Sequence, residues 1–190
     1  YNLYFTLKTD LFSLKDKVIV ITGAGGMLGR QHADAVAAAG GIPVLLDLFA
    51  ESVDEVVIAL RKNYDLDVMG YAVDITKEQQ VLSNCREVLK RFGRINALIN
   101  NATNNPKIES ADEKNFSRLE NFPMDFWQAD LDVGLTGSFL CAKYYGTAIS
   151  KNTDGGVILN ISSDLGLIAP DQRLYEQPGL PDDQQPVKPV

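Results

Sequence analysis

The sequence predicts an α/β protein built on a doubly wound parallel β-sheet, and three observations support this prediction. Short apolar runs of strand length alternate along the chain with longer stretches of helical periodicity. Strands that alternate with helices of about 12 to 18 residues form right-handed βαβ units with parallel strands. A glycine cluster directly follows the first apolar run, and all five apolar runs end in a glycine or a small polar residue. Such sheets bind ligands at the carboxyl ends of their strands, where we expect the site.

Composition excludes several classes of function. The chain has 190 residues, 45% of them hydrophobic, which suits one domain with a hydrophobic core. The net charge of −7 argues against nucleic acid or an anionic membrane as a partner, because like charges repel. No apolar run approaches the ~20 residues that span a bilayer, and no signal-like leader is present. We therefore predict a cytoplasmic protein.

The cysteines and the histidine give little sign of a covalent or metal framework. Cys85 and Cys141 each fall within a predicted helix, which disfavours a disulfide framework and favours a reducing compartment. The single His32 has no second histidine or cysteine nearby. We therefore predict no metal site and expect His32 to be a helix-surface residue.

The first third of the predicted domain sets the pattern. Residues 1–14 form a leader arm without periodicity, residues 15–170 form the nucleotide-binding domain, and residues 171–190 form an irregular tail. Residues 18–21 are a continuous β-branched run, typical of a strand buried on both faces. A helix is expected at 28–39, where a glycine pair stops it.

The same unit then recurs with different residues. Further strands are predicted at 43–47, 68–73, 97–99 and 157–161, and further helices at 51–63, 76–92, 123–131 and 132–150. Thr76 is expected to cap its helix. A polar loop fills 103–121, and the stretch after Pro170 is rich in Pro, Gln and Asp, without a predicted element.

The glycine cluster is the first candidate binding feature. It lies directly between the first strand and the first helix and comprises Thr22, Gly23, Ala24, Gly25, Gly26, Met27, Leu28 and Gly29. Glycines permit a tight turn and let a pyrophosphate approach the backbone N–H groups at the helix start. A plain βα turn is the alternative.

Polar residues at the ends of the next strands complete the candidate site. Asp47 can accept hydrogen bonds from the adenosine ribose hydroxyls and would repel a 2′-phosphate, which favours NAD over NADP. The alternative is that Arg30 binds this 2′-phosphate, which would favour NADP. Asp74 and the Ile75 amide can hold the adenine, and the small residues at Asn101 and Ala102 let a cofactor ribose lie close.

Taken together, these residues resemble the short-chain dehydrogenase/reductase family from about residue 14 to residue 166. Thr22-Gly23 and Gly29 match the family's glycine signature, with Met27 in place of the middle glycine. Asn100-Asn101-Ala102 matches its Asn-Asn-Ala-Gly motif, with Thr103 in place of the last glycine, and Asp74 matches its acidic residue. Asn160-Ile161-Ser162-Ser163 matches its serine strand. The resemblance implies a Rossmann-type fold with about five of seven strands present here, and Ser163 as a catalytic residue.

Two departures from the family pattern bear on activity. Gly134 stands where the family has a catalytic asparagine. The family's Tyr-x-x-x-Lys pair, which moves the proton, should follow the serine by roughly a dozen residues, but the residue four positions after Tyr175 is Gly179. We therefore expect a C-terminally truncated, inactive chain in which residues 171–190 are an insertion.

The resemblance implies an NAD-dependent oxidoreductase that acts on a small-molecule alcohol or carbonyl compound. A narrower likeness, to members from bacterial surface-polysaccharide and flagellin-glycan pathways, suggests a sugar or sugar nucleotide as the substrate. The alternatives are a non-catalytic dinucleotide-binding or regulatory protein and a nucleotide-sugar epimerase of the extended branch.

The resemblance also implies a homodimer or homotetramer. In the family, the long helix before the fifth strand packs against its copy in a partner subunit. Here that helix offers apolar residues every three to four positions, namely Leu135, Phe139, Leu140, Tyr144 and Ile149.

Overall fold

The computed structural model describes residues 12–104 and 119–186. Residues 1–11 of the predicted leader, 105–118 of the predicted polar loop and 187–190 of the predicted tail lie outside the described residues. Two compact units make up the chain, one formed by residues 1–103 and 133–161 and the other by residues 104–132 and 162–190.

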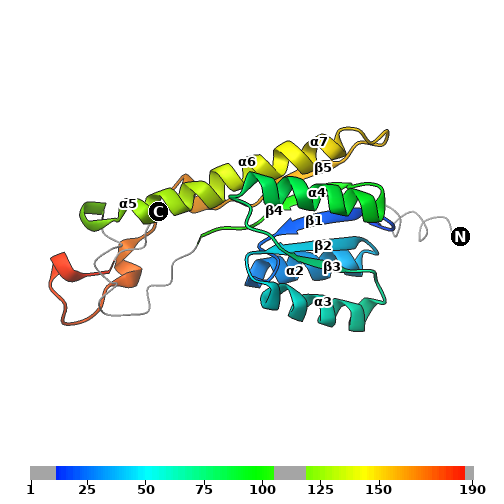
Figure 1. Cartoon of the computed structure of the whole chain (residues 1–190). Coiled ribbons are helices and arrows are strands. Elements are labelled where there is room, and N and C mark those ends of the chain that lie inside the picture. The colour runs from blue at the N-terminus through cyan, green and yellow to red at the C-terminus, as the bar shows by residue number, and fades with distance from the viewer. Residues whose placement is uncertain (1–11, 105–118, 187–190) are drawn as a thin grey trace, which may run out of the picture. The chain divides into compact units, whose positions relative to one another are not determined.

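The first unit is built on a parallel five-stranded sheet in the order β3-β2-β1-β4-β5 (Figure 1). The strands are β1 (Val18–Thr22), β2 (Ile42–Asp47), β3 (Met69–Ala72), β4 (Ala97–Asn100) and β5 (Val157–Asn160). The helices that connect the first four strands are α2 (Met27–Ala38), α3 (Ala50–Tyr64) and α4 (Glu78–Phe92). The predicted α/β fold with five parallel strands is confirmed.

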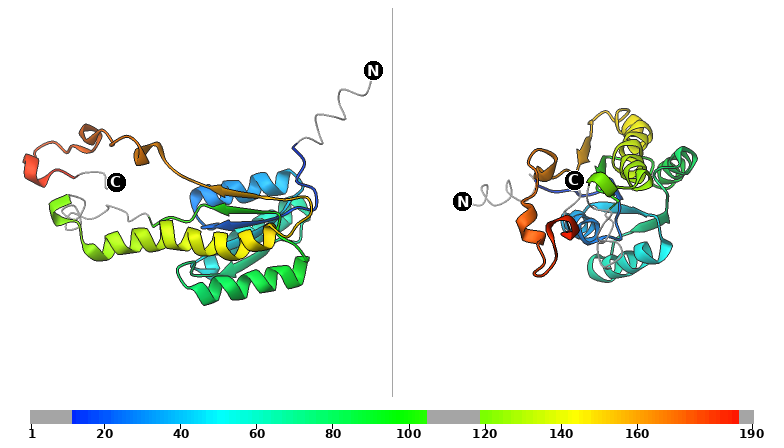
Figure 2. Two further views of the ribbon diagram at one scale, coloured as in Figure 1. Left: turned by 90° about the horizontal axis from the view of Figure 1, so that it is seen from above. Right: turned by 90° about the vertical axis from the view of Figure 1, so that its left-hand side faces the viewer.

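Each face of the sheet buries its own core, because neighbouring strand residues point to opposite faces. Along β1, Val18 and Val20 join a cluster that includes residues of α4 and of the long helix before β5. Ile19 and Ile21 join a second cluster with residues of α2 and α3. Both faces of β1 are thus buried, as the continuous β-branched run predicts, and helices lie on both faces of the sheet (Figure 2).

A long helical run precedes β5. Its α-helical parts are α5 (Met124–Leu131), α6 (Ser138–Cys141) and α7 (Thr147–Ile149), and π-type turns at Asp132–Gly137 and Ala142–Gly146 join them. Asp132 has helical backbone angles, φ −64° and ψ −42°. The two helices predicted at 123–131 and 132–150 are therefore continuous at their junction.

Other expectations need correction. Thr76 does not cap α4, whose N-cap residue is Lys77; the N–H and the hydroxyl of Thr76 both donate to Asp74 Oδ1. Leu140 and Ile149 are buried against the sheet rather than available to a partner, whereas Leu135 and Phe139 are exposed. His32 is half-buried rather than a surface residue, and its Nε2 is enclosed without a hydrogen-bond partner among the described residues.

The second unit contains α5 and short 3₁₀ turns at Leu119–Asn121, Asp164–Gly166, Gln172–Tyr175 and Asp182–Gln184. Within the described stretches, no helix has both the length and the apolar character needed to cross a membrane. Cys85 and Cys141 are free and buried, and burial raises their pKa to about 11 and about 12, which keeps both as thiols at neutral pH.

Candidate cofactor-binding site

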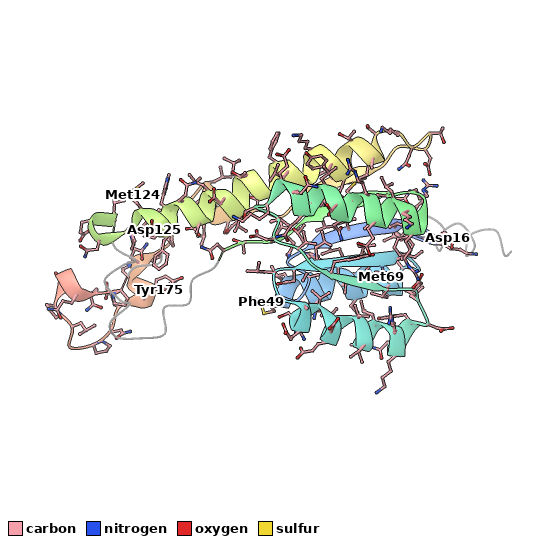
Figure 3. All side chains as sticks on the ribbon, viewed as in Figure 1. Asp16, Phe49, Met69, Met124, Asp125 and Tyr175 are labelled. Carbon is pink, nitrogen blue, oxygen red and sulfur yellow. The ribbon has the colours of Figure 1, made fainter. Side chains whose placement is uncertain are left out.

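The carboxyl ends of the first four strands bring the predicted cofactor residues to one edge of the sheet. Phe49, just after β2, marks this edge, and Met69, the first residue of β3, marks the opposite one (Figure 3). β2 and β3 lie on one side of β1, and β4 and β5 lie on the other. The chain therefore reverses direction across the sheet between β1 and β4, where open α/β sheets bind their ligands.

Thr22 and Asn101 join the ends of β1 and β4 at this reversal. The fully buried Thr22 hydroxyl accepts the N–H groups of Asn101 and Ala102, each at 3.0 Å. In return, Asn101 Nδ2 donates to the carbonyl oxygens of Thr22 and Gly23, at 3.0 and 3.2 Å. The Thr22 side chain thus supports the glycine turn from inside the protein and fixes where that turn begins.

Two glycines of the turn are required by close packing. Gly23 has a φ of +63°, and a Cβ there would lie 2.8 Å from the Cα of Ala102. A Cβ on Gly29 would lie 2.7 Å from the Cα of Ala24 and even closer to the carbonyl oxygen of Gly23. Helix α2 therefore starts so close to the backbone of the turn that a side chain fits at neither Gly23 nor Gly29.

The start of α2 is open to an anion. Gly26 is its N-cap and supplies no side-chain cap, and the first turn contains no acidic residue. The first N–H groups of a helix have no partner within the helix, and the helix dipole makes this end positive. Met27, which replaces the family's middle glycine, has an 80% exposed side chain and so does not crowd the turn. These features fit a pyrophosphate at this position.

Asp47 places a carboxylate beside the glycine turn. Its Oδ2 accepts the N–H of Gly25 at 2.9 Å, and its Oδ1 accepts the N–H of Leu48 at 2.8 Å. The side chain is partly exposed. Because each carboxylate oxygen can accept more than one hydrogen bond, both remain able to accept ribose hydroxyls.

Asp74 follows β3 and turns the chain toward α4. Its Oδ1 accepts the N–H of Thr76 at 2.9 Å and the Thr76 hydroxyl at 2.6 Å. The N–H of Val73 donates to the carbonyl oxygen of Asp47 at 2.7 Å, so the ends of β2 and β3 are tied together. The Ile75 side chain belongs to the core, so only its backbone amide is left to contact the adenine, as predicted from the sequence.

The Arg30 guanidinium, the alternative candidate for binding a 2′-phosphate, is already engaged in hydrogen bonds. Its Nε donates to the carbonyl oxygen of Gly25 at 2.7 Å, and a terminal guanidinium nitrogen donates to Glu55 Oε2 at 2.9 Å. Glu55 is not among the residues predicted from the sequence, because no motif links a residue of α3 to the glycine turn.

Ser163 and Gly134, the two positions that the family resemblance assigns to catalysis, have their own local surroundings. Ser163 belongs to the second unit, where its Oγ accepts the N–H of Leu165 at 3.1 Å and caps the turn at Asp164–Gly166. Gly134 is an exposed residue of the first π-type turn, and a Cβ there would meet nothing within 4 Å.

The neighbouring Lys143 and Tyr144 do not form a catalytic pair. Both side chains bond to Glu78 Oε1, Lys143 at 2.7 Å and Tyr144 at 2.6 Å. The hydrogen bond to Glu78 raises the pKa of Tyr144 above its usual value. A tyrosine that acts as a general acid or base near neutral pH needs the opposite shift.

Comparison with known proteins identifies similar chains. The family described as short chain dehydrogenase matches residues 17–175. The NAD-dependent glycerol dehydrogenase of Listeria innocua is 31% identical over 163 residues, which are 86% of this chain and 59% of that protein. The D-threitol dehydrogenase of Mycolicibacterium smegmatis is 28% identical over 163 residues, covering 86% and 58%. A crystal structure of NAD⁺-bound xylitol dehydrogenase matches with a TM-score of 0.74 and 27% identity, over 83% of this chain and 56% of that one. The chain thus spans somewhat more than half the length of these relatives.

Proposed function

The chain belongs to the short-chain dehydrogenase family, and we propose that it forms the cofactor-binding part of an NAD-dependent oxidoreductase that interconverts an alcohol and a carbonyl compound. The observation that carries this proposal is the uncapped start of α2 beside the Asp47 carboxylate. Bound NAD supplies the hydride acceptor. The first N–H groups of α2 hold the pyrophosphate, and Asp47 holds the adenosine ribose.

Asp47 also favours NAD over NADP in this proposal. Its carboxylate is fixed by two backbone N–H groups and cannot easily turn away from a 2′-phosphate. The names of the glycerol dehydrogenase and the xylitol dehydrogenase, which state NAD, support the same cofactor.

We propose a small polyhydroxylated alcohol or the corresponding sugar as the substrate class. The relatives named for glycerol, D-threitol and xylitol support it, since all three compounds are polyols. In this proposal Ser163 donates a hydrogen bond to the substrate oxygen.

Proton transfer requires a group that these 190 residues do not offer at the family's position, because the only tyrosine after Ser163, Tyr175, is followed four positions later by Gly179 and not by lysine. Loss of a general acid or base commonly lowers a rate by ~10²–10⁴. We therefore expect this chain to bind NADH without turning over a polyol. The same observation favours a second candidate, a non-catalytic dinucleotide-binding protein. A longer product of the gene that contains Tyr-x-x-x-Lys and oxidises a polyol would select the enzyme.

A charge placed at the start of α2 tests the cofactor site. Met27 is exposed, and an acidic residue in the first turn of a helix is favourable for folding. Met27→Asp should therefore fold but repel the pyrophosphate, so the Kd for NADH should rise at least tenfold in a fluorescence titration. Met27→Asn, which has the same shape without the charge, is the control and should bind within about threefold of the unmodified chain. Equal curves for the Asp and Asn variants would contradict the proposed site.

A further inference from the structure

Four residues form a continuous hydrogen-bonded chain behind the glycine turn. Asp47 Oδ2 accepts the N–H of Gly25 at 2.9 Å, and the carbonyl oxygen of Gly25 accepts Arg30 Nε at 2.7 Å. A terminal nitrogen of Arg30 donates in turn to Glu55 Oε2 at 2.9 Å. This series of hydrogen bonds connects the end of β2, the glycine turn, α2 and α3. Within it, only Gly25 separates the Asp47 carboxylate from the Arg30 guanidinium.

This position makes Arg30 a potential phosphate ligand. A guanidinium presents several N–H donors in a planar fork that suits phosphate oxygens. Here the carbonyl oxygen of Gly25 and the carboxylate of Glu55 engage that fork. The Glu55 carboxylate also balances the positive charge of Arg30, which lowers the attraction of the guanidinium for a 2′-phosphate on the adenosine ribose.

We propose that Glu55 is a specificity-determining residue of the cofactor site. It holds the Arg30 side chain against the glycine turn and away from a phosphate on the ribose beside Asp47. Glu55 is a positioning residue, since it acts through Arg30. The inference rests on the proposed function, because it requires the adenosine ribose to lie at Asp47.

The exposure of the ion pair sets the size of the effect. The side chains of Arg30 and Glu55 are 43% and 69% exposed. Exposed pairs contribute little, so release of Arg30 should change the affinity for NADPH by about two- to fivefold. The larger part of the discrimination stays with Asp47.

Competition titration separates this role from a general effect of charge. NADPH displaces NADH from the unmodified chain, from Glu55→Ala and from Asp54→Ala. Asp54 is the matched control, because it lies beside Glu55 on α3, is exposed, and has no hydrogen bond to Arg30 among the described residues. We expect Glu55→Ala to bind NADPH two- to fivefold more tightly and NADH within twofold, with Asp54→Ala unchanged for both.

A second pair of variants tests whether the gain passes through Arg30. The gain from Glu55→Ala should disappear when it is added to Arg30→Gln, and it should shrink in high salt, as expected for a contact between charges. An NADPH affinity unaltered by Glu55→Ala, or altered equally by Asp54→Ala, would overturn the role of Glu55 while NADH binding still supports the cofactor site. If the unmodified chain shows no saturable NADH binding, the proposed function fails and this inference fails with it.

Discussion

At the residue scale, Asp47 and Thr22 contribute to the site in different ways. The Thr22 hydroxyl is buried and bonded to the backbone that follows β4, so its side chain serves the position of the turn. The Asp47 carboxylate is partly exposed and borders the turn from β2. Substitution of Thr22 should therefore affect stability, and substitution of Asp47 should affect the choice of cofactor.

Asp47→Asn should narrow the preference for NADH over NADPH. The asparagine keeps an oxygen that can accept the N–H of Gly25, but it loses the charge that repels a 2′-phosphate. The ratio of the two Kd values should fall several-fold to about a hundredfold, the range of one strong polar contact of ~1–3 kcal/mol. Titration with both cofactors measures this ratio. The prediction is lost if the unmodified chain already gives equal curves for NADH and NADPH.

The site could be predicted from the sequence where a motif names both the residue and its neighbours in the chain. The glycine turn, Asp47 and Asp74 all lie at the expected edge because each stands at, or within two residues of, the carboxyl end of a strand. Glu55 could not be predicted in this way. It meets Arg30 only because α2 and α3 pack on the same face of the sheet, 25 residues apart in the chain.

At the element scale, the turn before β5 is tied to two earlier parts of the fold. Asp154 accepts Lys17 Nζ at 2.8 Å and a terminal nitrogen of Arg94 at 2.7 and 3.0 Å. Lys17 precedes β1, and Arg94 lies between α4 and β4. The hydrogen bonds from Lys17 and then Arg94 lower the pKa of Asp154 from 3.8 to about 2.

This pKa shift predicts how stability depends on pH. A carboxyl group whose pKa is lower in the folded state stabilises the fold at pH values above its unfolded pKa. That contribution falls as pH drops from about 4 toward 2, when the folded carboxylate takes up a proton. Asp154→Asn should therefore lower Tm at pH 6, and the difference from the unmodified chain should shrink between pH 4 and pH 2. A difference that is constant from pH 6 to pH 2 would contradict the prediction.

The elements themselves were predicted well because their periods are local. All five strands and the helices between the first four appear at or within a few residues of the expected positions. The internal structure of the long helix before β5 was harder to predict from the sequence. Asn100 Nδ2 donates to the carbonyl oxygen of Ser138, 38 residues away, at the end of the first π-type turn. Such a contact depends on packing, so a local pattern does not reveal where a helix changes its hydrogen bonding.

At the scale of the whole molecule, β5 stands at one edge of the described sheet. A Cβ on Gly146 would lie 2.8 Å from Ile158, so Ile158 packs toward the long helix. Val157 and Leu159 point to the opposite face and are exposed. An exposed apolar edge strand presents unpaired backbone groups together with apolar side chains, and both promote pairing with another chain.

We therefore predict that the 190-residue chain self-associates through β5, whereas the homodimer or homotetramer expected for the whole protein follows from the family resemblance and not from this edge. Sedimentation velocity at micromolar concentrations should detect species larger than the monomer. Val157→Lys should reduce the association, because lysine on an edge strand opposes pairing. Ile58→Lys is the control, since Ile58 on α3 is 68% exposed, close to the 61% of Val157, and lies away from the edge strand. Association that persists in Val157→Lys and falls in Ile58→Lys would place the contact on the exposed face of α3. A monomer at every concentration would show that β5 does not pair with another chain.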